Sequence, residues 1–109
     1  MKPISHIKLV GLNDQARLFD VYPKETKFKD VVCLYAFLSP VQGGFKVLYI
    51  GQTTELGTRL ANHHKWDEAS RRGFEYVAVC TDVSLLGLDI EEESLIRRYS
   101  PECNQQLCS

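Results

Sequence analysis

The most informative absence in this 109-residue sequence is a long apolar run. A membrane-spanning helix needs about 20 consecutive apolar residues, and no stretch of the chain comes close. Internal repeats and low-complexity tracts are absent as well, and the opening residues MKPISHIKLV lack the apolar core of a secretion signal. We therefore expect a globular protein of the cytoplasm that has a hydrophobic core of its own and no contact with a membrane.

Cysteine is too sparse and too scattered to suggest a disulfide framework. The chain contains four cysteines, which are Cys33, Cys80, Cys103 and Cys108. The first two lie inside apolar runs, where a free thiol packs as a small hydrophobic group. One alternative stays open, a zinc site that staples an interaction domain and is formed by Cys103, Cys108, His63 and His64. A single C-x4-C pair is weak evidence for such a site.

The sequence also lacks an excess of positive charge, because 13 Lys and Arg stand against 14 Asp and Glu, for a formal net charge of −1. This balance disfavours a protein that holds nucleic acid by bulk electrostatics alone. The cations nevertheless gather in the middle of the chain, at Lys46, Arg59, Lys65, Arg71 and Arg72. This group is either an ordinary solvated surface or the place where a polyanion binds.

What the sequence does contain is an alternation of strand-like and helix-like segments. Three apolar and β-branched stretches predict strands, the first of them buried on both faces: residues 31–38, 45–50 and 74–80. Helical patterns predict three helices: one at residues 54–64, one at residues 67–72, and a last one that is capped by Thr81, Asp82 or Ser84 and ends near Tyr99. The order predicts an α+β fold, with a small three-stranded antiparallel or mixed β-sheet flanked by helices.

Residues 1–30 are expected to form an N-terminal extension, and residues 31–109 the main domain. Two alternating segments of the extension predict an additional β-hairpin, at residues 6–10 and 17–22. Thr53 or Thr54 is the expected N-cap of the helix that follows the second main strand.

A carboxylate interrupts the apolar face of the last predicted helix. At about 100° per residue the apolar side chains form one stripe, which comprises Leu85, Leu88, Leu95, Ile96 and Tyr99. Glu92 falls in the middle of this stripe, whereas Glu93 points away from it. An unpaired charge is costly on a buried face, so Glu92 either forms a buried salt bridge, for example to Arg59, or lies in a cleft. We favour the cleft, where a carboxylate serves as a metal ligand or has a shifted pKa.

Aromatic and basic residues gather around the strand-to-helix turn of VLYIGQTTELGTRLANHH, residues 47–64. Tyr35 and Tyr49 lie on two predicted strands. Arg59 and His63 have i, i+4 spacing, which places them side by side on a helix. Each of these residues alone is explained by packing or by an exposed charge. Their combination suggests a common site.

Together these residues resemble the motifs of the GIY-YIG nuclease family. The segment CLY at residues 33–35 corresponds to the first motif, and YIG at residues 49–51 corresponds to the second. The segment ESLIRRYSPECN, with Glu92 directly before it, is similar to the family pattern E-x-x-L-I followed by P-x-x-N. The resemblance covers residues 31–106 and implies the GIY-YIG fold. It also implies a metal-dependent endonuclease that hydrolyses phosphodiester bonds.

The resemblance implies a role for each matched residue. Catalytic roles fall on Tyr35, Tyr49, Arg59, His63, Glu92 and Asn104. Substrate-binding roles are expected at Gly51, Gln52, Lys46 and Lys65. Glu92 would anchor Mg²⁺ or Mn²⁺, since Mg²⁺ is held by few carboxylates. Either tyrosine suits the general base, and Gly51 would let the chain leave the strand where a phosphate approaches.

The implied partner is nucleic acid, with DNA favoured over RNA and with structure-dependent or low sequence specificity, as in DNA repair or recombination. Residues 1–30 leave little room for a recognition element, so a separate protein is a candidate source of specificity. The alternative function is a non-catalytic module that keeps the fold and binds nucleic acid or protein.

A shared site also sets a condition on strand register, because side chains directly opposite each other on antiparallel strands share a face. We expect Tyr35 to pair with Tyr49 across the five-residue loop PVQGG at residues 40–44. Both rings would then point toward the following helix, with Glu92 closing the cleft.

Overall fold

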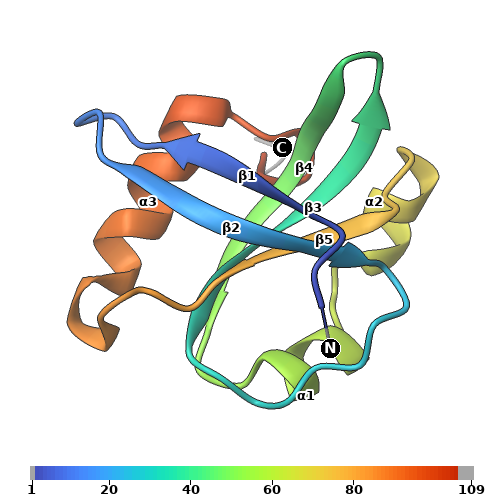
Figure 1. The fold of residues 1–109 in the computed structure, drawn as a ribbon, viewed down its shortest axis with the longest axis horizontal. Coiled ribbons are helices and arrows are strands. Elements are labelled where there is room, and N and C mark those ends of the chain that lie inside the picture. Colours follow the sequence, from blue (N-terminus) through green and yellow to red (C-terminus); the bar gives the residue numbers. More distant parts are fainter. Residues whose placement is uncertain (1, 106–109) are drawn as a thin grey trace.

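The computed structural model describes residues 2–105, and Figure 1 shows the course of the chain. The strands are β1 (Ser5–Val10), β2 (Ala16–Pro23), β3 (Cys33–Val41), β4 (Gly44–Thr53) and β5 (Tyr76–Cys80). The α-helices are α1 (Leu56–Ala61), α2 (Trp66–Arg71) and α3 (Leu88–Tyr99). Two 3-10 turns complete the described part, η1 (Leu85–Gly87) and η2 (Glu102–Asn104). Each strand and helix that the sequence predicted is present, with shifted ends.

All the strands belong to one antiparallel sheet with the order β1-β2-β5-β3-β4. The α+β class is confirmed, but the expected count of three strands is wrong, because the sheet has five. β1 and β2 form the predicted N-terminal hairpin. β2 pairs with β5 from Asp20–Val79 to Pro23–Tyr76, so the hairpin covers an edge of β5 that would otherwise be unpaired.

Helices cover both faces of this sheet (Figure 1). On one face α3 packs Leu88 and Leu95 against the strands. On the other face α1, α2 and η2 contribute Leu56, Ala69 and Cys103 to a cluster rich in aromatic rings. β3 lies between β5 and β4 and its apolar residues are buried on both faces, as predicted. Within residues 2–105 no helix has both the length and the apolar character that crossing a membrane requires.

One irregularity in the β3–β4 pairing determines which way the side chains of β4 point. The pair Leu38–Val47 is followed by the pair Phe37–Tyr49. Leu48 is therefore an extra residue in β4, which defines a β-bulge. Because opposite residues share a face, Tyr49 lies on the same side of the sheet as Phe37. A regular ladder would have placed Tyr49 on the other side.

The direct pairing of Tyr35 with Tyr49 is not formed, and that prediction is wrong. Tyr35 lies opposite Gly51, and Tyr49 is its diagonal neighbour on β4. The turn is also tighter than the predicted loop, because Val41 pairs with Gly44. The two tyrosine rings nevertheless share a face, and their centroids are 6.1 Å apart. The requirement for a common site is therefore met by a different register.

The start of α1 has a cap that comes from outside the helix. Its N-cap residue is Glu55, not a threonine, and the side chain of Glu55 forms no capping hydrogen bond. Instead the carboxylate of Asp30 accepts the backbone N–H of Thr58 at 2.7 Å and its hydroxyl at 2.9 Å. Gly57 permits this approach, since a Cβ there would lie 2.2 Å from the carbonyl oxygen of Phe28.

The start of α3 also differs from the predicted helix. Ser84 accepts the backbone N–H of Leu86 and caps the turn η1. Leu85 lies in this turn and is 62% exposed, so it does not belong to the buried stripe. Leu88 and Leu95 are buried as predicted. The apolar stripe is therefore confirmed only from the beginning of α3.

Gly57→Ala should destabilise the fold by about 1–3 kcal/mol, although alanine is the better helix former, because the added methyl group collides with backbone. Gly44→Ala is the matched control, since no heavy atom lies within 4 Å of a Cβ at that position. Urea denaturation of both variants measures the difference. Equal stabilities would contradict the close packing of α1 on the loop before β3.

Candidate functional site

Tyr35 lies at the centre of the aromatic cluster beneath α1 and α2. Its side chain is fully buried, and its ring lies over Gly51. A Cβ at Gly51 would lie 2.6 Å from the hydroxyl oxygen of Tyr35. Gly51 thus makes room for the tyrosine, and it does not end the strand, because β4 continues to Thr53. Burial raises the pKa of Tyr35, so its hydroxyl keeps its proton at neutral pH.

His63 follows the end of α1, and both of its ring nitrogens are hydrogen-bonded, one of them to the cluster. Its Nδ1 accepts the backbone N–H of Lys65 at 2.9 Å, and its Nε2 lies 2.8 Å from the hydroxyl oxygen of Tyr35. Burial, together with nearby positive charge, lowers the pKa of His63 to about 4. The ring is therefore neutral at pH 7 and has one N–H, which must be on Nε2 because Nδ1 is an acceptor. His63 donates its hydrogen bond to Tyr35.

Tyr49 is the tyrosine that reaches the surface. It is 8% exposed, whereas Tyr35 is 0% exposed. Burial raises the pKa of Tyr49, while the neighbouring Tyr35 hydroxyl and the charge of Arg59 oppose this rise. Arg59, on α1, lies near the Tyr35 hydroxyl, and this proximity raises the pKa of the guanidinium. His63, Tyr35 and Arg59 therefore all lie close to Tyr49, since His63 is hydrogen-bonded to Tyr35 and the rings of both neighbour the ring of Tyr49.

Glu92 approaches this cluster from α3. It is partly buried and accepts a hydrogen bond from the Gln52 amide at 3.2 Å. Burial raises the pKa of Glu92. The Gln52 hydrogen bond and the charge of Arg59 lower it, whereas the charge of Asp89 raises it further. Among residues 2–105 no ion pair includes Glu92, so the salt bridge to Arg59 considered above is not formed.

Asp89 lies one turn before Glu92 and was missed by sequence reasoning. The amide of Gln52 donates to Asp89 as well as to Glu92, so one neutral donor serves two carboxylates. In the described part of the chain neither carboxylate has a Lys or Arg partner. The i, i+3 spacing of the two acids was the available signal, since such residues are neighbours on a helix.

Asn104 attaches the segment after α3 to β4. Its side-chain oxygen accepts the backbone N–H of Ile50 at 2.7 Å, and its amide donates to the carbonyl of Ile50 at 2.9 Å. Ile50 lies between Tyr49 and Gly51 in the chain. Asn104 therefore acts on the cluster through the backbone that carries Tyr49.

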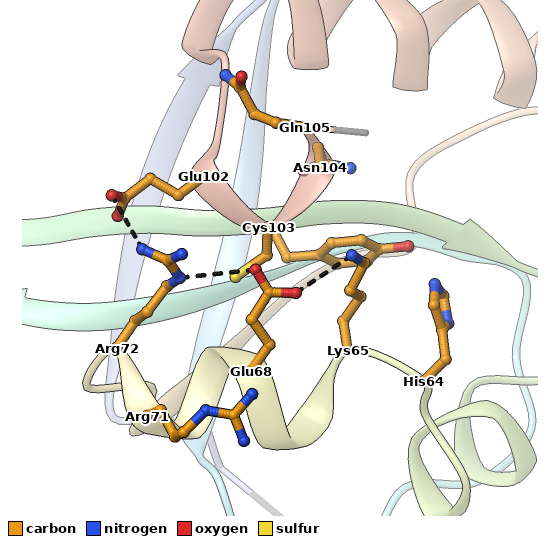
Figure 2. A pocket seen from close by; sticks show the side chains of 10 residues that line it. His64, Lys65, Glu68, Arg71, Arg72, Glu102, Cys103, Asn104 and Gln105 are labelled. Carbon is orange, nitrogen blue, oxygen red and sulfur yellow. Dashed lines mark hydrogen bonds and ion pairs between the residues drawn. The ribbon is translucent and has the colours of Figure 1, made fainter. Parts of the chain in front are cut away.

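A groove of about 1060 Å³ opens beside Tyr49, between α2 and η2, and we call it the α2–η2 groove (Figure 2). The two lysines expected to bind substrate belong to this region. Lys65 lines the groove and pairs with Glu68 at 3.2 Å, and Lys46 pairs with Glu102 at 2.8 Å. Both glutamates line the groove and were missed, because a charge pattern along the chain does not show which acid meets which cation.

The structure thus brings Tyr35, Tyr49, Arg59 and His63 together, with Glu92 near enough to influence their charges. They come from β3, β4, α1, the turn after α1, and α3. Of the remaining residues named from the sequence, those that contact the backbone or border the site are Gly51, Gln52, Asn104, Lys46 and Lys65.

The zinc alternative gains no support from the described residues. Cys103 is fully buried in the aromatic cluster, and Cys108 lies outside the described residues. Across residues 2–105 no group of three or more His, Cys, Asp and Glu side chains is placed to hold a metal ion. The zinc site stays an untested hypothesis.

The buried, neutral state of His63 should make the protein less stable in mild acid. Its folded-state pKa of about 4 lies below the usual 6.5, so the unfolded chain takes up the proton first and stability falls as the pH drops from 6.5 toward 4. Between pH 7 and pH 5 the loss due to His63 is about 2 kcal/mol.

Urea unfolding at these two pH values measures the loss. His63→Gln should remove most of it, whereas His64→Gln, at the exposed neighbouring position, should reduce it only slightly, because burial is the larger cause of the lowered pKa of His63 and the charge of His64 a smaller one. The same pH dependence in His63→Gln as in the parent protein would refute the buried neutral state.

Comparison with known proteins does not identify a family for this chain. No family model matches it, and neither a curated protein nor a solved structure does so. The resemblance to the GIY-YIG nucleases therefore rests on the sequence motifs alone.

Proposed function

We propose that this protein is a metal-dependent endonuclease that hydrolyses phosphodiester bonds in nucleic acid, with DNA as the favoured substrate. The observation that carries the proposal is the approach of a guanidinium and a carboxylate to two tyrosines whose ring centroids are 6.1 Å apart, one of which lines an open groove. These groups belong to Tyr35, Tyr49, Arg59 and Glu92, which come from four different elements. Ordinary pairing within one helix or one hairpin does not account for such a set.

The carboxylates at the end of the cluster suit a divalent metal ion. Glu92 is partly buried and shares the Gln52 amide with Asp89, while neither has a cationic partner among residues 2–105. Mg²⁺ needs only one or two protein carboxylates, because it keeps several of its waters. When bound there, Mg²⁺ or Mn²⁺ would offset the charge of the phosphate and activate a water molecule.

Arg59 and Tyr49 have the properties that the reaction requires of the protein. Arg59 would hold the non-bridging oxygens of the phosphate with its planar pair of N–H donors. Tyr49 would first lose its own proton to solvent. Water would then form a bond to phosphorus as the bond to the leaving oxygen breaks; the tyrosinate of Tyr49 would take the proton of the water, and the leaving oxygen would take a proton from solvent. Tyr49 suits this role better than Tyr35, because it lines the groove whereas Tyr35 is fully buried, and because the charge of Arg59 favours its ionised form.

Tyr35 and His63 would then act as positioning residues. His63 donates to Tyr35, and Tyr35 in turn has its own proton available for Tyr49. Hydrogen bonds to a charged oxygen favour that charged form. The pair would therefore stabilise the tyrosinate of Tyr49 from the buried side of the sheet.

Glu92→Ala should abolish cleavage and leave thermal stability unchanged or higher, since it removes a carboxylate whose burial is costly. Nicking of supercoiled plasmid and cleavage of labelled branched, nicked and linear DNA and RNA, each with Mg²⁺ or Mn²⁺, measure the effect.

The matched control is Glu93→Ala, because this neighbouring carboxylate is exposed and pairs with Arg97 at 2.7 Å. It should cleave at the parent rate. Equal loss in both variants would argue against Glu92 as the metal anchor. A parent protein that binds nucleic acid and cleaves none of it would favour the non-catalytic module.

Arg59→Lys keeps the positive charge and loses the two-pronged donor, so cleavage should fall by about tenfold to a hundredfold. Arg98→Lys, at an exposed position on α3, serves as the control and should change nothing. Rates of single-turnover cleavage measure both. A lysine variant as active as the parent would show that Arg59 is ordinary surface charge.

A further inference from the structure

Carboxylates hold most of the cations in the α2–η2 groove. Arg72 lies between Glu102 and Glu68, with N–O distances of 3.2 Å and 3.6 Å. Glu68 also pairs with Lys65 at 3.2 Å, and Glu102 also pairs with Lys46 at 2.8 Å. Figure 2 shows the contacts of Arg72 and Lys65 with these two acids. Two glutamates therefore hold three cations.

Arg71 adds a further cation on the same helix. It lines the groove, is exposed, and has no carboxylate partner among residues 2–105. The groove is lined by three cations, Lys65, Arg71 and Arg72, and two carboxylates, and Lys46 beside it brings the local excess to two positive charges, although the whole chain has a net charge of −1. The surface around the groove is therefore positively charged, although the chain as a whole has a net negative charge.

The ion pairs of the groove are of a kind that a ligand can replace. The side chains of Lys46 and Glu102 are 52% and 44% exposed, and those of Lys65 and Glu68 are 28% and 32% exposed. Pairs of this exposure contribute little to stability. Phosphate oxygens would accept hydrogen bonds from the same N–H donors. The groove is also continuous with the proposed catalytic cluster, because Tyr49 lines it.

We propose that the α2–η2 groove binds the phosphate backbone of the nucleic acid beyond the cleavage site, and that Glu68 and Glu102 are internal competitors for its cations. The identity of the ligand rests on the proposed function. Phosphates must displace these carboxylates before they reach Lys46, Lys65 and Arg72. The two glutamates therefore limit how tightly the groove holds its ligand.

Fluorescence anisotropy with a short fluorescein-labelled DNA duplex in EDTA measures binding without cleavage. Glu102→Gln frees Lys46 and removes one of the two acids that pair with Arg72, so binding should become about threefold to tenfold tighter. Glu93→Gln removes the same charge from an exposed pair with Arg97 and does not line the groove. This control should change the affinity by less than about twofold.

Arg71→Ala should weaken binding and lower the slope of log Kd against log salt concentration by about 0.9, the value for one phosphate contact. Arg98→Ala is its control, because Arg98 is exposed on α3 and does not line the groove. Equal effects of Arg71→Ala and Arg98→Ala would overturn the proposal.

If Glu102→Gln and Glu93→Gln changed the affinity for DNA equally, the change would come from the net charge of the protein, and this result would also overturn the proposal. So would the absence of measurable binding in Glu102→Gln. A different result would overturn the endonuclease proposal: the protein binds DNA but does not cleave it once Mg²⁺ or Mn²⁺ is added. Normal cleavage with unaltered binding in Glu102→Gln would overturn the role of the groove alone.

Discussion

The extra residue at Leu48 decides on which face of the sheet the following side chains of β4 lie. In a regular continuation of the ladder Tyr49 would oppose Ala36, which packs in the cluster beneath α3. With the bulge Tyr49 joins Tyr35 on the face of α1 and α2, and Ile50 enters the core beneath α3. The approach of Tyr49 to Tyr35 and to the basic residues of α1 and the turn after it depends on this single insertion.

Local patterns in the sequence were sufficient where the structure depends on periodicity along one element. Helical spacing singled out Glu92, and the continuous apolar run of β3 predicted a strand buried on both faces. Contacts between elements were harder to predict. Leu48 is an ordinary strand residue, and its neighbours in the sequence do not indicate a bulge. The cap that Asp30 supplies to α1 comes from a separate loop, so no local capping motif contains it. Likewise, the predicted hairpin of β1 and β2 had no visible signal for its pairing with β5.

The polar groups of the cluster lie within a packed aromatic layer. The ring of His63 contacts the ring of Phe37, with centroids 4.8 Å apart, and stands edge-on to the ring of Tyr35. Throughout residues 2–105 no buried side-chain nitrogen or oxygen lacks a hydrogen-bond partner. Hydrogen bonds in such surroundings are stronger than in water, and an unpaired member is costly. The orientation of Tyr49 is therefore coupled to the packing of the core. Substitutions in the core should shift the Tyr49 side chain where it lines the groove.

The hydrogen bonds of Asn104 also affect how this molecule meets other copies of itself. β4 is the last strand of the sheet, so its outward N–H and C=O groups are available to a strand from another chain. The Asn104 amide bonds both polar groups of Ile50 and takes the place that a neighbouring strand would occupy. A side chain that orients the candidate site thereby also blocks edge-to-edge pairing, the usual first step of β-sheet aggregation.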